Sequence, residues 1–316
     1  MTEPLLEIEG LRVTFGSKAP VQAVTDVSFN VGRGEVLGII GESGSGKTVT
    51  GLSILRLLPE YARSTAKTLR YNGKDLASVD NDAFDLMRGR ELSMIFQDPV
   101  GSFNPVKSIG WHLQKSLRMA APDAVFDLEL LLKEVGIHNA GRVLNSYPHQ
   151  LSGGMLQRAL IAMVFALRPS LIIADEPTTN LDNIMEGQIL SLIRRRQQES
   201  GTSMIFITHD LTIARSICNR IAVMYSGEIV EIGEADAITE RPRHPYTAGL
   251  LKTAMSLERG DSDLYEISGE PGSLTRGDVC RFSPRCPDVI ASCRTMHPLL
   301  VKTEPGLSIR CIRHDR

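Results

Sequence analysis

Short runs of apolar residues recur along the chain, and most have the length of a β-strand. The runs that predict strands are EVLGIIG (35–41), LSMIFQ (92–97), LIIADE (171–176), SMIFITH (203–209) and RIAVMYSG (220–227). The inner runs are apolar at consecutive positions, which is typical of strands buried on both faces of a parallel sheet. Between the runs, helical periodicity predicts helices over Lys47–Leu58, Ser152–Leu167 and Ile184–Glu199. Strands that alternate with helices indicate an α/β fold.

Two segments depart from this alternation. From Pro99 to Leu151 the pattern is helical and has several helix breakers, so we expect an inserted helical subdomain over about 99–168. After about Glu240 the stretch RPRHPYTAGLLKTA predicts one more helix, and the rest is short, rich in Pro and Gly, and basic. We therefore expect a main domain over 1–240 and a C-terminal extension over 241–316.

Composition excludes several classes of protein. A net charge of −2 gives no sign of generic binding to nucleic acid or to anionic membranes. The N-terminus MTEPLLEIEG lacks the basic start and apolar core of a signal peptide. The longest apolar run, Ala159–Leu167, is far shorter than the roughly 20 residues that a membrane helix needs. We expect a cytosolic chain that reaches a membrane only through partners.

The stretch GESGSGKT follows one predicted strand and precedes one predicted helix, and it matches the phosphate-loop pattern G-x-x-x-x-G-K-[ST]. Its residues are Gly41, Glu42, Ser43, Gly44, Ser45, Gly46, Lys47 and Thr48. Backbone N–H groups of such a loop and the positive end of the next helix bind phosphates. We expect Lys47 to reach the β- and γ-phosphates of a nucleotide and Thr48 to be a ligand of Mg²⁺. The alternative is a glycine-rich turn that binds nothing.

The run LIIADE ends in two adjacent acids, Asp175 and Glu176. At the carboxyl end of a buried strand they would lie at the edge of the sheet where open α/β proteins bind ligands. We expect Asp175 to hold Mg²⁺ and Glu176 to orient and deprotonate the attacking water. An ordinary turn at the end of a strand is the alternative.

The stretch LSGGMLQR (151–158) distinguishes among the many nucleotide hydrolases with these two elements. Taken alone, Ser152 and two glycines at the start of a helix could be only a good N-cap. However, the stretch precedes Asp175 by about 20 residues, and three polar residues accompany it: Gln97 ends an earlier strand, Asp182 follows Glu176, and His209 ends the next strand.

Together these motifs resemble the ATP-binding subunits of ABC transporters, over nearly the whole chain. The resemblance implies an ATPase that works as a head-to-tail dimer, with two ATP molecules between phosphate loops and signature helices. Ser152, Gly153 and Gly154 would contact the γ-phosphate bound by the other subunit. The roles that the resemblance implies for the remaining residues are these: Gln97 senses Mg²⁺ and touches the membrane partner, Asp182 communicates across the dimer, His209 contacts the γ-phosphate, and Phe15 stacks on adenine. A soluble ABC-type ATPase that acts on nucleic acid or ribosomes is the alternative.

Three further stretches, YPHQLSGGM (147–155), RPRHPYTAGLL (241–251) and CRFSPRCP (280–287), resemble the dipeptide and oligopeptide importer branch. Relatives in this branch import nickel, glutathione, opines or antimicrobial peptides. The resemblance implies a second ATPase subunit (a paralogue or a second copy), two transmembrane permease subunits and an extracytoplasmic solute-binding protein, and no nucleic acid. The chain would lie at the cytoplasmic face of the cell membrane, and the sequence does not identify its cargo.

Four of the five cysteines lie in the extension, at Cys280, Cys286, Cys293 and Cys311. The spacing lacks the close C-x₂-C pairs of most zinc ribbons, so a metal site has moderate support from spacing alone. Pro287 after Cys286 is typical of iron–sulfur ligands, and each of the four has a neighbouring arginine that we expect to offset thiolate charge. The family comparison implies a 4Fe–4S cluster. Zinc and no metal are the alternatives, and either metal could simply staple a segment too short to bury a core.

Overall fold

The computed structural model describes residues 3–16, 20–179, 181–259, 265–270 and 279–314. Contacts divide the chain into two compact units. We call Met1–Val31, Val36–Asp75 and Phe206–Arg316 the phosphate-loop unit, and Gly32–Glu35 with Leu76–Ile205 the helical unit. The C-terminal extension therefore belongs to the same unit as the phosphate loop, and whether it is a domain of its own stays a prediction. Among the described residues, no helix is long and apolar enough to cross a membrane.

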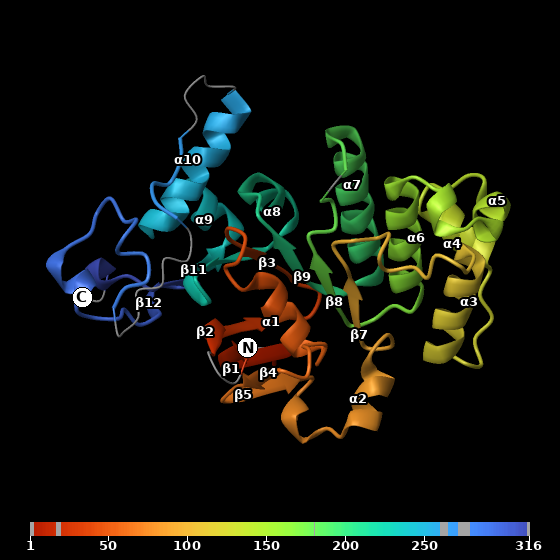
Figure 1. Ribbon diagram of the computed structural model, residues 1–316, viewed down its shortest axis with the longest axis horizontal. Coiled ribbons are helices and arrows are strands. Elements are labelled where there is room, and N and C mark those ends of the chain that lie inside the picture. Colours follow the sequence, from red (N-terminus) through yellow and green to blue (C-terminus); the bar gives the residue numbers. More distant parts are fainter. Residues whose placement is uncertain (1–2, 17–19, 180, 260–264, 271–278, 315–316) are drawn as a thin grey trace. The chain divides into compact units, whose positions relative to one another are not determined.

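The phosphate-loop unit is built on a mixed sheet with the strand order β6-β5-β1-β2-β11-β10-β3. Figure 1 labels strands β1, β2, β3, β5 and β11 of this order. Its strands are β1 (Leu6–Phe15), β2 (Val21–Val31), β3 (Val36–Ile40), β4 (Ala62–Thr65), β5 (Thr68–Tyr71), β6 (Lys74–Asp75), β10 (Arg220–Tyr225), β11 (Glu228–Glu234), β12 (Val301–Glu304) and β13 (Leu307–Ile309). Strand β10 runs parallel to β3, whereas β1 runs antiparallel to β2, β4 and β5. The two strands of this unit that the sequence predicts, β3 and β10, are thus parallel as expected, and the antiparallel strands around β1 were not predicted.

The buried strand β3 leads directly into the phosphate loop. All five of its residues are buried, as the consecutive apolar pattern predicts. The helices of this unit are α1 (Lys47–Ile54), α8 (Leu211–Ile217), α9 (Ala235–Glu240) and α10 (Pro245–Arg259). Helix α1 begins at Lys47 as predicted but ends before Leu58, because Arg56 takes a left-handed backbone conformation with φ 51°.

The extension contributes strands to the same sheet. Strands β12 and β13 form an antiparallel pair, and Ile309 of β13 lies opposite Glu231 of β11. This pairing attaches the last described segment to the sheet through backbone hydrogen bonds. The sequence analysis did not predict these two strands, since the segment is short and mostly polar.

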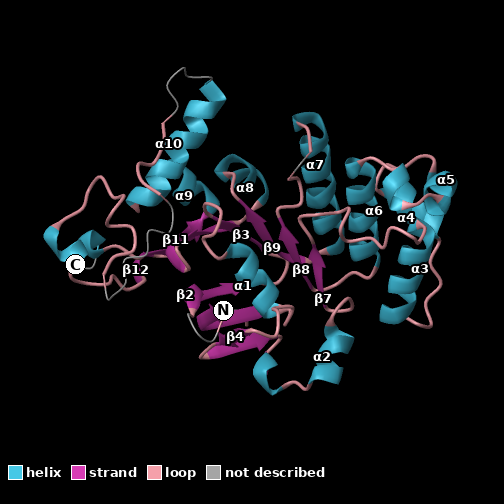
Figure 2. Ribbon diagram, in the orientation of Figure 1, coloured by secondary structure: helices cyan, strands magenta, loops and turns pink. Residues whose placement is uncertain are grey.

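The helical unit contains the parallel strands β7 (Leu92–Ile95) and β8 (Leu171–Asp175) and most of the long helices (Figure 2). Its helices are α2 (Asn81–Met87), α3 (Ile109–Ala120), α4 (Leu128–Glu134), α5 (Ala140–Asn145), α6 (Gly153–Ala166) and α7 (Asn183–Ser200). Helices α3, α4 and α5 pack on one another, and α3 and α4 also pack on α6. The helical subdomain over about 99–168 stays a prediction. Strand β9 (Ser203–Thr208) spans the boundary between the two units.

Helices α6 and α7 begin and end within one residue of the bounds that the sequence predicts. The Ser152 hydroxyl accepts a hydrogen bond from the Met155 N–H and caps α6. The Asp182 carboxylate accepts from the Ile184 and Met185 N–H groups and caps α7. Gly201 closes α7 with φ 67°, a left-handed conformation that glycine adopts without strain. Short 3₁₀ helices occur in the two units at Leu76–Ser78, Pro148–Gln150, Ala291–Arg294 and Ile312–His314.

Candidate functional site

The phosphate loop is packed so closely that two of its glycines leave no room for a side chain. A Cβ on Gly41 would lie 2.2 Å from the carbonyl oxygen of Met224, and a Cβ on Gly46 would lie 2.6 Å from the carbonyl oxygen of Ala23. Gly46 also has φ 102°. Gly44 has φ 79° and open space around it. The loop thus needs glycine for packing at Gly41 and Gly46, and for conformation at Gly44 and Gly46.

The side chains inside the loop are polar and buried. Lys47 is 5% exposed, and its ammonium group donates to the carbonyl oxygens of Gly41 at 2.8 Å and Glu42 at 3.1 Å. The Ser45 hydroxyl is buried without a hydrogen-bond partner among the described residues. Thr48 is half-buried, and Ser43 and Gly44 are exposed. A cation, a hydroxyl and a helix N-terminus within one loop are suited to bind phosphate oxygens.

The acid pair lies in the helical unit. Asp175 ends β8 and is 3% exposed, while the next residue, Glu176, is half-buried. Glu176 has φ 42°, a left-handed conformation that costs a non-glycine residue about 1 kcal/mol or more. Such strain is commonly found at functional sites, where neighbouring contacts hold it in place.

Two side chains hold the Glu176 carboxylate. The Gln97 amide donates to its Oε2 atom at 3.2 Å, and the Thr179 hydroxyl donates to the same atom at 2.8 Å. Gln97 is exposed beyond the end of β7. The structure therefore brings together Gln97 and Glu176, as the sequence analysis expects of a shared site. Thr179 was not predicted as a site residue. Its position three residues after Glu176 could have indicated that its hydroxyl reaches the carboxylate.

Four of the remaining predicted residues, Ser152, Gly153, Asp182 and His209, lie in exposed positions. Ser152 and Gly153 are exposed at the start of α6, and Asp182 is exposed at the start of α7. Gly154 is buried, and a Cβ there would lie 2.4 Å from the Met185 Cε atom. His209 is exposed just after β9, in the phosphate-loop unit. Ser152 and Asp182 each cap a helix, so both have a structural role whatever else they contact.

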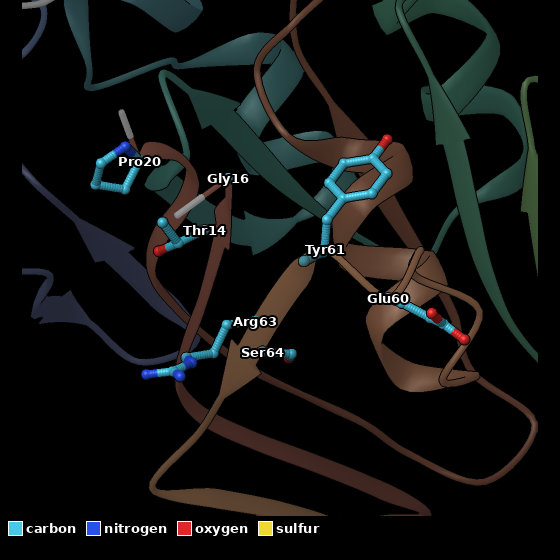
Figure 3. A pocket seen from close by; sticks show the side chains of 8 residues that line it. Thr14, Gly16, Pro20, Glu60, Tyr61, Arg63 and Ser64 are labelled. Carbon is cyan, nitrogen blue, oxygen red and sulfur yellow. The ribbon is translucent and has the colours of Figure 1, made fainter. Parts of the chain in front are cut away.

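Phe15 lies at the end of β1 beside an open pocket of about 820 Å³. Its ring packs against that of Tyr61, with the centroids 6.0 Å apart. Tyr61 lines the pocket and is 70% exposed, and Figure 3 shows its ring together with Thr14 and Arg63. An exposed aromatic ring beside an open pocket offers a stacking surface for a planar base. Sequence analysis missed Tyr61, because a lone tyrosine in a loop carries no motif.

The four cysteines of the extension lie close enough to interact electrostatically. The Cys280 N–H donates to the Cys293 carbonyl at 3.1 Å, and the Cys280 thiol interacts with those of Cys286, Cys293 and Cys311. Over the described ranges, however, no group of three or more His, Cys, Asp or Glu side chains is arranged to hold a metal ion. The geometry therefore shows a cysteine cluster but gives no support to the predicted metal site.

The arginines beside the cysteines do not behave as predicted. Arg281 pairs with Glu228 at 3.0 Å, Arg285 with Glu42 at 2.7 Å and Arg310 with Asp26 at 3.0 Å. Burial raises the pKa of the Cys280 thiol to about 11, and it also raises the pKa of the Cys286 thiol. The expectation that guanidinium groups promote thiolate formation was wrong, because these three cations are paired with carboxylates instead.

Three features together define the class of ABC-type ATPases. They are a buried strand that leads into a phosphate loop, an acid pair after another buried strand, and a helix that begins with a capped SGG sequence. Two family models match the chain: ABC transporter over residues 24–179, and the C-terminal region of oligopeptide/dipeptide transporters over residues 230–293.

Relatives of known name agree. The dipeptide transport ATP-binding protein DppD of Escherichia coli K12 is 40% identical over 97% of this chain and 96% of its own length. DppD of Haemophilus influenzae is 42% identical over 94% of this chain and 92% of its own. The solved dimer of the ATP-binding cassette MJ0796 with ADP and Pi covers 73% of this chain and 98% of that chain, with a TM-score of 0.64 and 26% identity. The chain belongs to the ATP-binding proteins of the oligopeptide and dipeptide branch of ABC transporters, and it is an ATPase of that family.

Proposed function

We propose that this chain binds and hydrolyses Mg-ATP to drive the import of peptides or related small solutes across the cytoplasmic membrane. The observation that carries the proposal is the Glu176 carboxylate, held at the end of β8 by Gln97 and Thr179 in a strained backbone conformation. A carboxylate fixed in this way is suited to accept a proton from water.

The phosphate loop and the acid pair have separate tasks in this proposal. Lys47 binds the β- and γ-phosphates, and Thr48 and Asp175 hold Mg²⁺, which neutralises charge on the transferred phosphoryl group. Glu176 orients a water molecule and takes its proton as the water oxygen attacks the γ-phosphorus; the bond to the ADP oxygen then breaks, which leaves ADP and phosphate. Gln97 positions Glu176 and contributes an oxygen ligand for Mg²⁺.

The base and the terminal phosphate are recognised by other residues. Phe15, and with it Tyr61, stacks on adenine at the pocket next to β1. His209 contacts the γ-phosphate. Ser152, Gly153 and Gly154 contact the γ-phosphate held by a second ATPase subunit, and Asp182 lies at that interface. The exposed N-terminus of α6 supports this assignment, since it presents backbone N–H groups and a positive helix end.

The proposal includes a set of partners. A second ATPase subunit, either a paralogue or another copy of this chain, forms the head-to-tail dimer. Two permease subunits bind the dimer at the cytoplasmic face of the membrane, and an extracytoplasmic binding protein delivers the solute. The names of DppD relatives, which describe dipeptide transport, support peptides as the cargo.

We also propose that Cys280, Cys286, Cys293 and Cys311 hold a 4Fe–4S cluster, with zinc as the second candidate. Four of the five cysteines lie in this segment and Pro287 follows Cys286, and these sequence features support the proposal. A cluster there would staple the extension and would require the four thiols to lose their protons. Anaerobic purification of the full chain followed by iron, sulfide and zinc analysis tests it. About four irons per chain supports the cluster, and stoichiometric zinc or no metal contradicts it.

The transport proposal is tested in cells that lack this chain. Uptake of a radiolabelled dipeptide should fall to background, and it should return with the wild-type chain but not with Glu176→Gln. Purification through a tag on this chain in mild detergent should bring down two permease subunits. Undiminished dipeptide uptake would contradict the peptide assignment, and recovery of ribosomes or DNA in place of permeases would favour the soluble alternative.

A further inference from the structure

Two side chains of the C-terminal extension contact the phosphate loop at one residue, Glu42. The Tyr246 hydroxyl oxygen accepts a hydrogen bond from the Glu42 backbone N–H at 3.0 Å. The Arg285 guanidinium donates to both carboxylate oxygens of Glu42, with Nη1 2.7 Å from Oε2 and Nη2 3.0 Å from Oε1. Backbone and side chain of one loop residue are therefore held from outside the loop, by residues more than 200 positions later in the sequence.

The contact with Arg285 is two-pronged and poorly accessible to water. The side chain of Arg285 is 3% exposed and that of Glu42 is 25% exposed. Arg285 also donates to the carbonyl oxygens of Ser268 and Ile267, each at 3.1 Å. A planar guanidinium with so many partners has one orientation, and a bidentate pair fixes its carboxylate in direction as well as in distance.

Tyr246 is held by a packed group of aromatic side chains. Its ring centroid lies 4.7 Å from that of Tyr225 and 5.4 Å from that of Phe282, and the residue is fully buried. The neighbouring His244 accepts from the Tyr246 N–H through Nδ1 at 3.1 Å. The histidine-proline-tyrosine element and the CRFSPRCP stretch, which the catalytic proposal does not use, thus meet beside the phosphate loop.

Glu42 is coupled to the residue that binds phosphate. The Lys47 ammonium donates to the carbonyl oxygens of Gly41 and Glu42. The Gly41 carbonyl belongs to the same peptide group as the N–H that Tyr246 holds, and the Glu42 carbonyl belongs to the next peptide group. When Tyr246 and Arg285 hold Glu42 in place, they also hold the start of the loop and the two carbonyl oxygens that accept hydrogen bonds from Lys47. A binding loop that is held in one conformation loses less entropy when its ligand binds.

We propose that Tyr246 and Arg285 are positioning residues for ATP, through which the fold of the C-terminal extension sets the nucleotide affinity of the phosphate loop. The inference rests on the proposed function in so far as the loop binds Mg-ATP. Neither side chain touches the reacting atoms. Both act through Glu42, so their removal should weaken nucleotide binding more than it slows hydrolysis at saturating ATP.

The test measures the Kd of the purified full chain for a non-hydrolysable ATP analogue with Mg²⁺, by calorimetry. Arg285→Ala removes a bidentate charged contact and should raise Kd about tenfold. Tyr246→Phe removes only the hydroxyl, keeps the ring in its packing, and should raise Kd about threefold. In turnover assays both variants should raise KM for ATP and leave kcat within about twofold.

Two matched controls lie in the same extension. Arg313 pairs with Asp288 at 3.1 Å in an exposed position, and Tyr265 packs beside Lys252. Arg313→Ala and Tyr265→Phe should leave Kd and KM at the wild-type values. Arg285→Lys keeps the charge but loses the two-pronged geometry, so its Kd should lie between those of wild type and Arg285→Ala.

A double-mutant cycle with Glu42→Gln isolates the contact. If Arg285 acts through Glu42, adding Arg285→Ala to Glu42→Gln should raise Kd much less than it does in the wild type. Wild-type affinity in folded Tyr246→Phe and Arg285→Lys would overturn the inference, and so would full additivity in the cycle. A wild-type chain that itself fails to bind the analogue would instead refute the proposed function, which separates the two failures.

Discussion

The side-chain amide of Gln97 lies 3.2 Å from the carboxylate of Glu176, although 79 residues separate the two in the sequence. Strands β7 and β8 are parallel neighbours, so their carboxyl ends, and the residues that follow them, meet at one edge. The Thr179 hydroxyl completes the arrangement at 2.8 Å. A carboxylate with two donors has a fixed direction, which a general base needs.

Thr179→Val tests the importance of that direction. The substitution keeps the β-branched shape and removes the hydroxyl that donates to Glu176. We expect kcat for ATP hydrolysis to fall roughly tenfold, with KM for ATP little changed, because Thr179 positions the base and does not bind the nucleotide. Steady-state phosphate release measures both constants. Thr295→Val, whose hydroxyl donates to Ser292 in an exposed turn, is the matched control and should behave as wild type. Unchanged kcat in Thr179→Val would remove Thr179 from the site.

Gly41→Ala tests the packing of the phosphate loop. Its Cβ would meet the Met224 carbonyl at 2.2 Å, so backbone must move, and we expect a loss of about 1–3 kcal/mol in the free energy of unfolding. Gly187→Ala is the matched control, because Gly187 lies inside α7 with open space at its Cβ. That variant should gain about 0.5–1 kcal/mol from helix propensity. Urea unfolding of both variants measures the effects, and equal stabilities would contradict the packing argument.

His244 should make the stability of the chain depend on pH. Burial, followed by the charge of His314, lowers the pKa of His244 to about 3 from its usual 6.5. The native state therefore excludes a proton that the unfolded state binds, so this stabilisation is present above pH 6.5 and is lost as pH falls towards 3. Between pH 7 and pH 5, protonation of His244 in the unfolded state should lower the free energy of unfolding by roughly 2 kcal/mol.

His244→Asn checks this contribution. The asparagine side chain keeps an acceptor for the Tyr246 N–H and has no group that titrates in this range. Denaturant unfolding at pH 7 and pH 5 should show a smaller loss of stability in the variant than in the wild type. If both proteins lose the same free energy between these pH values, His244 is not the cause.

Local sequence patterns predicted the elements that hold the chemistry. Strands β3 and β8 are buried at every position, and the residues at and after their ends carry the motifs. Strand β1 was missed because its apolar and polar positions alternate irregularly around Gly10, where the register shifts and φ is 62°. It pairs with the next strand, β2, and with β4 and β5 from a later part of the chain, and no local period reveals these later partners.

The side-chain pairs that the sequence did not predict join residues far apart along the chain. The pair Arg285–Glu42 spans 243 positions, and Arg310–Asp26 spans 284. From the sequence, such arginines were expected to act on the cysteines beside them, because only neighbours along the chain can be recognised there as partners. In the structure their guanidinium groups reach carboxylates of the sheet and the phosphate loop, so three of the four cations expected beside the cysteines are paired with carboxylates instead.

The most direct test of the account is ATP turnover by the transporter purified through a tag on this chain, with wild type and Glu176→Gln compared side by side. The amide cannot take the proton from water, so we expect phosphate release to fall at least 100-fold while the affinity for Mg-ATP is kept or increased. Glu199→Gln, on the exposed end of α7, should hydrolyse ATP as wild type does. Turnover of Glu176→Gln at the wild-type rate would contradict the assignment of Glu176 as the base, and with it the catalytic site proposed here.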